Sequence, residues 1–257
     1  MELTPAAKTY CAENFPGGKA PFADTDPEFA ALFANFAFDE VPQDSALDGQ
    51  TRFLAIMACL LGCQGLAAFR ALMPAALRGG VTPVQLKETV YQATAYLGLG
   101  RALPFLQAVN EGLAQQGVAL PLPGQATTTR ADRREKGTQV QVTLFGEHMQ
   151  DFWRSGPPET RRVNRWLAAN CFGDYYTRGG LDLRQRELVT FCFLAAQGGC
   201  EPQLVSHAAA NLRLGRDAAF LADVVAQCLP YVGYPRSLNA LRCVQQAAGQ
   251  QEKEGSI

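Results

Sequence analysis

The sequence predicts an all-α protein in which two helical domains follow one another in tandem, each built around a helical hairpin. Three observations lead to this fold class. The chain repeats itself at an offset of about 135 residues, and helix-capping residues recur at matching places in the two copies. The alternation typical of a strand is found only over Thr138–Leu144.

The two halves of the chain match in residue type and in order. Chance does not align so many types in sequence, so the chain is a duplication. The matches pair Leu32, Asn35 and Asp39 with Leu167, Asn170 and Asp174; Leu47, Asp48 and Arg52 with Leu181, Asp182 and Arg186; Leu77 and Gly80 with Leu212 and Gly215; and Tyr96, Gly98, Arg101 and Leu103 with Tyr231, Gly233, Arg236 and Leu238.

These matches divide the chain into four parts. Residues 1–25 form an N-terminal extension with several Pro and Gly residues, suited to clasp a neighbouring subunit. Residues 26–116 form the first repeat, which is degenerate, and residues 138–257 form the second. Residues 117–137 lie between them and are rich in Pro, Gly, Thr and charge, which is typical of a linker.

The helical hairpin is clearest in the second repeat. Asp182 can cap a helix, with Gln185 as its capping-box partner, and that helix runs to Gly198. A second helix begins near Pro202, an allowed first-turn residue, and ends at Gly215 in a left-handed cap.

Two further helices complete the second repeat, and the first repeat shows the same punctuation. We expect helices over residues 217–229 and 235–246, separated by the break YVGYP. In the first repeat Thr82, Pro83 and Gln85 mark a helix start as cap, first-turn proline and capping-box partner.

Composition and charge argue against several classes of partner. The chain has 23 basic and 24 acidic residues and a pI of about 6.2, so it has no overall positive field for nucleic acid. No apolar run approaches the roughly 20 residues that span a bilayer, and the N-terminus lacks the apolar core of a signal peptide. We therefore expect a soluble, cytoplasmic protein that binds neither nucleic acid nor membranes.

The cysteines and histidines argue against a metal site. Most of the eight cysteines lie in apolar helical sequence, where a free thiol behaves as a small hydrophobe. The closest pair, Cys59 and Cys63, lacks the Cys-x-x-Cys spacing of a redox dithiol or zinc site. The only histidines are His148, expected at the surface or an interface, and His207. We expect no metal and no cofactor.

Glu187 and His207 are the candidate catalytic residues. Glu187 enters a helix that is apolar on every side, where a carboxylate needs a partner and tends to carry function. His207 lies on a polar stripe with Gln203 and Asn211. Antiparallel packing of the hairpin sets Glu187 and His207 within roughly 6 Å along the axis, close enough for a direct or water-bridged contact.

Each of these residues also has a structural interpretation. Glu187 can pair with Arg184 or Arg186 in the first turns of its helix, and His207 can be a core histidine bonded to a backbone carbonyl. The carboxylate–imidazole pair is nevertheless a usual acid–base arrangement, so we favour the functional interpretation.

Four further residues are candidates for substrate binding. Gln203 shares the stripe of His207, and Arg186 and Arg236 can clamp a carboxylate, although they can equally hold each repeat together. Cys200 begins the helix of His207, where the helix dipole favours a reactive thiolate. Because Gln203 stands where a Cys-x-x-Cys partner would be, dithiol chemistry is unsupported, and we favour a small buried hydrophobe at Cys200.

The second repeat resembles the carboxymuconolactone decarboxylase family of small all-α proteins. The stretch that carries the resemblance is CFGDYYTRGGLDLRQRELVTFCFLAAQGGCEPQLVSHAAANLRLG, followed by YVGYPRSLNAL, with Glu187, His207, Gly215 and Tyr231-x-Gly233 in the family positions. The resemblance implies a cofactor-free lyase acting on a carboxylated unsaturated lactone such as 4-carboxymuconolactone, in aromatic-compound degradation. A related branch of the family reduces peroxiredoxin-type partners through a Cys-x-x-Cys pair.

This sequence departs from both family patterns. Cys200 and Gln203 occupy the Cys-x-x-Cys positions, so a thiol peroxidase or oxidoreductase would need Cys192 or a first-half cysteine as partner. Phe53 replaces the acid in the first repeat and Leu72 or Met73 replaces the histidine, which predicts one site per chain. A non-catalytic oligomeric binding protein is the third alternative. Because single-domain members form rings, often hexamers, the resemblance implies a homotrimer of this tandem chain.

Overall fold

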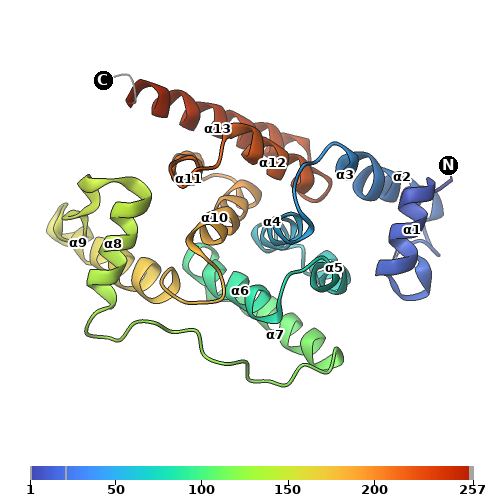
Figure 1. Cartoon of the computed structure of the whole chain (residues 1–257), viewed down its shortest axis with the longest axis horizontal. Helices are drawn as coiled ribbons and strands as arrows, with labels where there is room; N and C mark the ends of the chain where they lie inside the picture. The colour runs from blue at the N-terminus through green and yellow to red at the C-terminus, as the bar shows by residue number, and fades with distance from the viewer. Residues whose placement is uncertain (1, 21, 255–257) are drawn as a thin grey trace.

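The computed structural model describes residues 2–20 and 22–254, and every regular element in these residues is helical (Figure 1). The N-terminal part and first repeat contain α1 (Pro5–Asn14), η1 (Pro16–Gly18), α2 (Pro27–Asn35), η2 (Phe36–Glu40), α3 (Val41–Gln43), α4 (Gly49–Gly62), α5 (Leu66–Arg78), α6 (Pro83–Leu97) and α7 (Leu99–Gln115). The remainder contains α8 (Arg133–Phe145), η3 (Glu147–Met149), η4 (Phe152–Arg154), α9 (Pro158–Trp166), η5 (Leu167–Tyr175), α10 (Leu183–Gln197), α11 (Glu201–Arg213), α12 (Ala218–Val232) and α13 (Tyr234–Glu254). The all-α prediction is confirmed.

The predicted helix starts are present as hydrogen-bonded caps. The Asp182 carboxylate accepts from the backbone N–H of Gln185, whose side chain accepts from the backbone N–H of Asp182. Thr82 and Gln85 form the same reciprocal capping box at the start of α6. Each box satisfies two of the backbone donors that a helix N-terminus leaves unpaired, which fixes where the helix begins.

Helices α4 and α10, one from each repeat, lie side by side at the centre of the molecule (Figure 1). They run in the same direction, because Gln185 contacts Gln50 near the N-terminal ends and Gly62 lies against Phe193 toward the C-terminal ends. Every residue of α10 from Arg186 to Ala196 is buried. The central helix of the second repeat is therefore enclosed on all sides, as its apolar sequence predicts.

Each repeat contributes a helix that packs on the central helix of the other repeat. Helix α6 of the first repeat packs on α10, and α12 of the second repeat packs on α4. Two matching hydrogen bonds join the repeats at these contacts: Arg186 Nη1 donates to Gln92 Oε1 at 3.0 Å, and Arg52 Nε donates to Gln227 Oε1 at 2.8 Å. One buried cluster of apolar side chains extends through both repeats, so the two copies share a core.

The stretch with strand-like alternation, Thr138–Leu144, is helical and lies within α8. Tertiary packing overrides its β-branched residues, because Gly137 lets α8 pack directly on the backbone of η5 at Gly173. Helix α8 begins at Arg133, so residues 133–137 of the expected linker are helical as well. The last helix also continues past the expected end near residue 246, to Glu254.

The N-terminal extension lies on its own first repeat. The backbone N–H of Thr4 donates to Asn35 Oδ1, and Asn35 Nδ2 donates to the carbonyl oxygen of Glu2. The ring of Tyr10 stacks on that of Phe38 with centroids 4.2 Å apart. These contacts hold the extension on its own first repeat, and a clasp on a neighbouring subunit stays a prediction.

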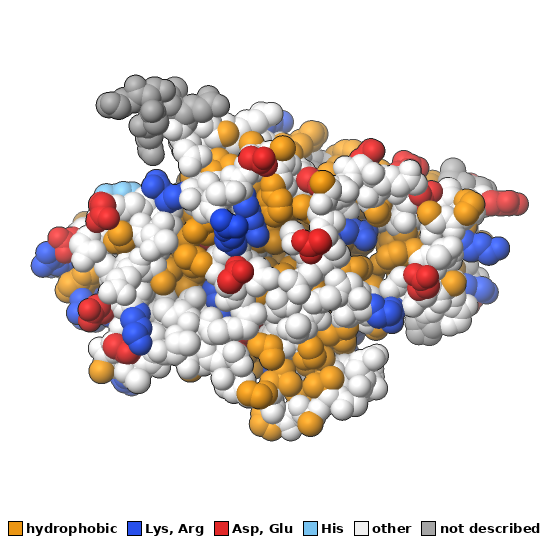
Figure 2. Space-filling model, in the orientation of Figure 1, with side chains coloured by type: hydrophobic (Ala, Val, Ile, Leu, Met, Phe, Trp, Pro, Cys, Tyr) orange, Lys and Arg blue, Asp and Glu red, His pale blue; other side chains and the backbone are white. Residues whose placement is uncertain are grey.

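The surface in view carries basic and acidic side chains scattered among apolar patches, without a broad area of one sign (Figure 2). Within residues 2–20 and 22–254, no helix combines the length and the apolar character needed to cross a bilayer.

The contact between α4 and α10 makes a testable prediction for stability. A Cβ added at Gly62 would lie 2.6 Å from the carbonyl oxygen of Phe193 and 2.8 Å from the Cβ of Ala196, so we expect Gly62→Ala to lower the free energy of unfolding by about 1–3 kcal/mol. Gly100→Ala is the matched control, because a Cβ there meets nothing within 4 Å and alanine favours the helix. Urea unfolding measures both, and equal stability of the two variants would contradict the close packing.

Candidate active site

Glu187 is fully buried at the start of α10, and both of its carboxylate oxygens have partners. Oε1 accepts a hydrogen bond from the Tyr176 hydroxyl at 2.7 Å, and Oε2 lies 2.7 Å from His207 Nδ1. A carboxylate taken out of water requires such partners, since each unpaired oxygen would carry a large desolvation penalty. The partners of the Glu187 carboxylate are thus Tyr176 and His207, and not Arg184 or Arg186 as in the structural interpretation.

His207 reaches Glu187 from α11, as the antiparallel hairpin predicts, and the contact is direct. Asn211, one turn further along, donates from Nδ2 to the carbonyl oxygens of Glu187 at 3.1 Å and His207 at 2.8 Å. This amide ties the two helices together beside the pair. The imidazole and the carboxylate are therefore held at a fixed separation by backbone as well as side-chain contacts.

Two tyrosines extend the pair into a hydrogen-bonded network. Tyr176 also contacts Thr190 Oγ1 at 3.0 Å and the hydroxyl of Tyr96 at 2.9 Å, and Tyr96 lies 3.5 Å from His207 Nε2. Burial raises the pKa of both tyrosines well above 10, so both hydroxyls keep their protons and Tyr176 donates to Glu187.

This arrangement assigns the two ring nitrogens of His207 different tasks. The remaining oxygen of the Glu187 carboxylate accepts from Nδ1–H, which leaves Nε2 directed toward Tyr96. The ring is flanked edge-on by Tyr96 and Phe145, with centroids 5.4 and 5.5 Å away. Nε2 is thus the nitrogen available for proton transfer.

His207 opens onto a cavity of about 380 Å³. Tyr96 and Gln203 line it beside His207, and Phe145 and Phe172 provide much of its apolar wall. The volume falls within the range of small-molecule sites, which are mostly apolar with a few polar groups. An organic molecule the size of a substituted five-membered ring fits this description.

The first repeat has a corresponding cavity without this chemistry. Leu72, Ala68 and Tyr231 line an apolar space of about 290 Å³ and stand about 135 residues before or after His207, Gln203 and Tyr96. The histidine and the amide are replaced by hydrocarbon, and only the tyrosine is kept. This supports a single reactive site per chain.

Of the four candidate binding residues, only Gln203 lines the cavity of His207. Arg186 is fully buried elsewhere, where it donates to Glu88 Oε2 at 3.1 Å and to two backbone carbonyl oxygens. Arg236 borders a small void beside Cys59, Cys192 and Cys228. Arg186 joins the two repeats, which agrees better with the structural alternative than with a substrate clamp.

Cys200 stands at the N-terminal boundary of α11, as predicted, but its environment does not favour a thiolate. Burial raises the pKa of its thiol above the ordinary value of 9, and Sγ donates to the carbonyl oxygen of Leu194 at 3.5 Å. Desolvation outweighs the helix dipole here, which agrees with the interpretation of Cys200 as a small hydrophobe and not with a reactive thiolate. Cys192 also does not serve as its partner, because its thiol lies with Cys59 and Cys228.

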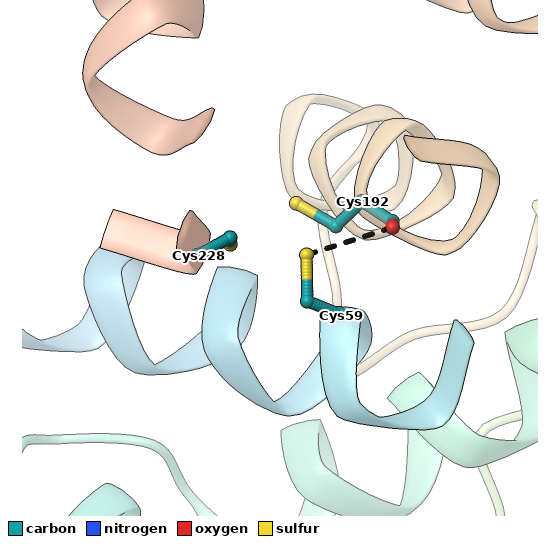
Figure 3. Close-up of side chains that lie close together, drawn as sticks. All are labelled: Cys59, Cys192 and Cys228. Carbon is teal, nitrogen blue, oxygen red and sulfur yellow. Dashed lines mark hydrogen bonds between the residues drawn. The ribbon is translucent and has the colours of Figure 1, made fainter. Parts of the chain in front are cut away.

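Those three thiols form a buried cluster that the sequence spacing does not reveal (Figure 3). They come from α10, α4 and α12, and their sulfur atoms all lie within 4.8 Å of one another. Thiolates are ligands for soft ions such as Cu(I) or zinc, but a closed zinc site takes four ligands. Among the described residues, this is the group whose geometry comes nearest to a metal site.

The sequence model of the carboxymuconolactone decarboxylase family matches the chain twice, over residues 27–111 and 161–246. The chain belongs to this family. A tandem arrangement of two decarboxylase-family domains is therefore established, as the sequence predicts.

One solved structure carries the same fold over the whole length of this family member. It is a crystal structure from Burkholderia xenovorans LB400, provisionally assigned as a gamma-carboxymuconolactone decarboxylase subunit. The two share 19% sequence identity over 96% of this chain and 97% of that one, with a TM-score of 0.54. A search of curated proteins finds no significant match.

Sequence reasoning missed the tyrosines and the cavity wall of this carboxymuconolactone decarboxylase-family site. Tyr96 was identified only as one of the repeat matches, and nothing in its spacing shows that it reaches across to the other repeat. Tyr176 precedes Glu187 by eleven residues and can meet it only because the chain turns back between η5 and α10. A Glu in a helix that is apolar on every side was the available signal, since a buried carboxylate requires hydrogen-bond donors.

The raised pKa of Cys200 predicts slow reaction with alkylating reagents. At any pH below the raised pKa its thiolate fraction is smaller than in the unfolded chain, so iodoacetamide should modify native Cys200 more slowly than unfolded Cys200 at pH 7. Its rate should rise about tenfold per pH unit and level off only above pH 9. Peptide mapping by mass spectrometry follows this residue separately from the other thiols. Faster modification of native than of unfolded Cys200 at pH 7 would contradict this prediction and favour the thiol-based alternative for the function.

Proposed function

We propose that this protein removes carbon dioxide from a carboxylated unsaturated lactone of the 4-carboxymuconolactone type, without a cofactor. The observation that carries the proposal is the buried Glu187–His207 pair, whose histidine lines a mostly apolar cavity. Family membership and the decarboxylase assignment of the Burkholderia protein support it.

The reaction needs one bond broken and one proton delivered. The bond between the ring carbon and the carboxylate breaks, and its electron pair moves through the conjugated double bond toward the lactone carbonyl as carbon dioxide leaves. Protonated His207 then delivers the Nε2 proton to the ring carbon next to that carbonyl, which shifts the double bond. A proton from solvent restores His207, so the reaction consumes one proton and releases one carbon dioxide.

The surroundings favour this step in two ways. Apolar walls such as Phe145 and Phe172 disfavour the substrate carboxylate relative to neutral carbon dioxide. Glu187 accepts from Nδ1–H, which orients the imidazole and stabilises its protonated form before the proton is transferred. Gln203, on the cavity wall, is placed to bind a polar group of the substrate.

The proposal predicts loss of turnover in two variants. We expect His207→Ala and Glu187→Gln to lower kcat on freshly generated 4-carboxymuconolactone about 100- to 10,000-fold, the usual contribution of general acid–base catalysis. Mass spectrometry follows conversion to a product lighter by one carbon dioxide. Leu72→Met, at the first-repeat position equivalent to His207, is the control that should keep turnover.

Two other outcomes would contradict the proposed function. Folded variants with full activity would show that the pair has no part in the chemistry. Absence of turnover by the wild type would leave the thiol-based and the non-catalytic alternatives. A peroxide assay of the wild type and of Cys200→Ser tests the first, and ligand-binding measurements test the second.

We also propose that the chain assembles as a homotrimer. Leu99 and Leu103 are exposed on α7, and Tyr234 and Leu238 are exposed at the equivalent places on α13, so each repeat presents a similar apolar patch. Repeated patches on a molecule suit closed cyclic assembly.

Light scattering coupled to size exclusion tests this assembly. We expect a mass three times the 27.8 kDa of the chain, and expect Leu238→Glu to shift the mass toward that of a single chain. Leu120→Glu, which changes an exposed leucine in the segment between α7 and α8, should leave the mass unchanged. A wild-type mass of one chain would refute the trimer.

A further inference from the structure

We propose that Gln141 is a substrate-binding residue that donates a hydrogen bond from Nε2 to the lactone carbonyl oxygen. Gln141 lies on α8, has no exposed surface, and lines the cavity of His207. Neither its Nε2 nor its Oε1 has a hydrogen-bond partner within the protein. The inference rests on the proposed function and adds the group that recognises the lactone.

The isolation of this amide is exceptional for the protein. Gln92 and Gln227 are equally buried, yet Gln92 accepts from Arg186 and donates to Thr190, while Gln227 accepts from Arg52 and donates to the carbonyl oxygen of Val41. Among the described side chains, Gln141 is the one that leaves two buried polar atoms unpaired. Unpaired buried polar atoms destabilise a fold, so Leu or Met would be the more stable choice at position 141 if the side chain were needed only for packing.

A bound ligand removes this penalty. The cavity is the space that Gln141 shares with His207 and Tyr96. The rest of its wall is mostly apolar, with rings such as Phe145 and Phe172, and includes the polar residues His148, Gln203 and Ser206. A ligand oxygen is the natural partner for the amide N–H in these surroundings. Gln141 and His207 belong to different helices, α8 and α11, so one flat ring can contact both.

The proposed reaction supplies an oxygen that needs this donor. When the carboxylate leaves as carbon dioxide, its electron pair moves into the conjugated ring and negative charge develops on the lactone carbonyl oxygen. A fixed N–H aimed at that oxygen stabilises the transition state more than the ground state, and His207 then protonates the adjacent carbon. The substrate class is therefore a lactone whose carbonyl is conjugated with the ring double bond.

Two small probes separate recognition of the lactone from turnover. Muconolactone has the unsaturated lactone ring and an acetate arm but lacks the ring carboxylate, so it cannot undergo the proposed decarboxylation. Furan-2-ylacetate keeps the ring size and the acetate arm and has no lactone carbonyl. Calorimetric titration of the full chain with each probe compares the wild type with Gln141→Met, which keeps the side-chain length and removes both polar atoms.

We expect Gln141→Met to weaken muconolactone binding about tenfold, as for loss of one buried hydrogen bond, and to leave furan-2-ylacetate binding unchanged. On 4-carboxymuconolactone its kcat should fall about 100-fold, the range for removal of one donor to a developing oxyanion. Its melting temperature should equal or exceed that of the wild type, because the unpaired atoms are gone. A merely structural role predicts the opposite change in melting temperature.

The outcomes distinguish this inference from the proposed function. Normal turnover and normal muconolactone binding by Gln141→Met would overturn the inference and leave decarboxylation standing. Muconolactone binding that depends on Gln141, in a protein without turnover, would support lactone recognition and remove the decarboxylase proposal. Equal weakening of both probes, or failure of the wild type to bind muconolactone, would overturn the role of Gln141.

Discussion

A helix that is enclosed on every side has no water to solvate its polar side chains, and this constraint governs the centre of the molecule. Helix α10 carries Arg186, Glu187 and Thr190 into the interior, and each takes its partners from another element. Arg186 reaches the first repeat, and Glu187 reaches α11 and Tyr176 in the turn that follows η5. The same requirement for internal partners thus joins the repeats and assembles the acid–base pair.

Much of this arrangement can be predicted from sequence because it depends on local signals. The capping boxes at Thr82 and Asp182 fix two helix starts, and helix geometry then brings Glu187 and His207 to the same level of a hairpin. The contact at 2.7 Å confirms that reasoning. The spacing of the two residues along one hairpin is enough to predict this contact, since the turn between the two helices is short.

The remaining features depend on contacts between segments far apart in the chain. Tyr96 joins the site from the other repeat, and the wall formed by α8 comes from a stretch whose β-branched residues alternate like a strand. The thiol cluster likewise needs three helices to converge. The pKa of Cys200 likewise depends on packing, because the helix start favours a thiolate and the desolvation that opposes it comes from tertiary contacts.

The crosswise covering of α4 and α10 means that a single repeat is not a self-sufficient unit. Taken alone, one repeat would expose the face that α6 or α12 of the other covers, and the second-repeat site would lose Tyr96. A one-repeat ancestor with this architecture would have had to pair with an identical copy, and both of its sites would have changed together. Fusion into one chain lets the two halves diverge: one keeps the reactive histidine, and the other, with Leu72 in its place, is free to specialise in stability.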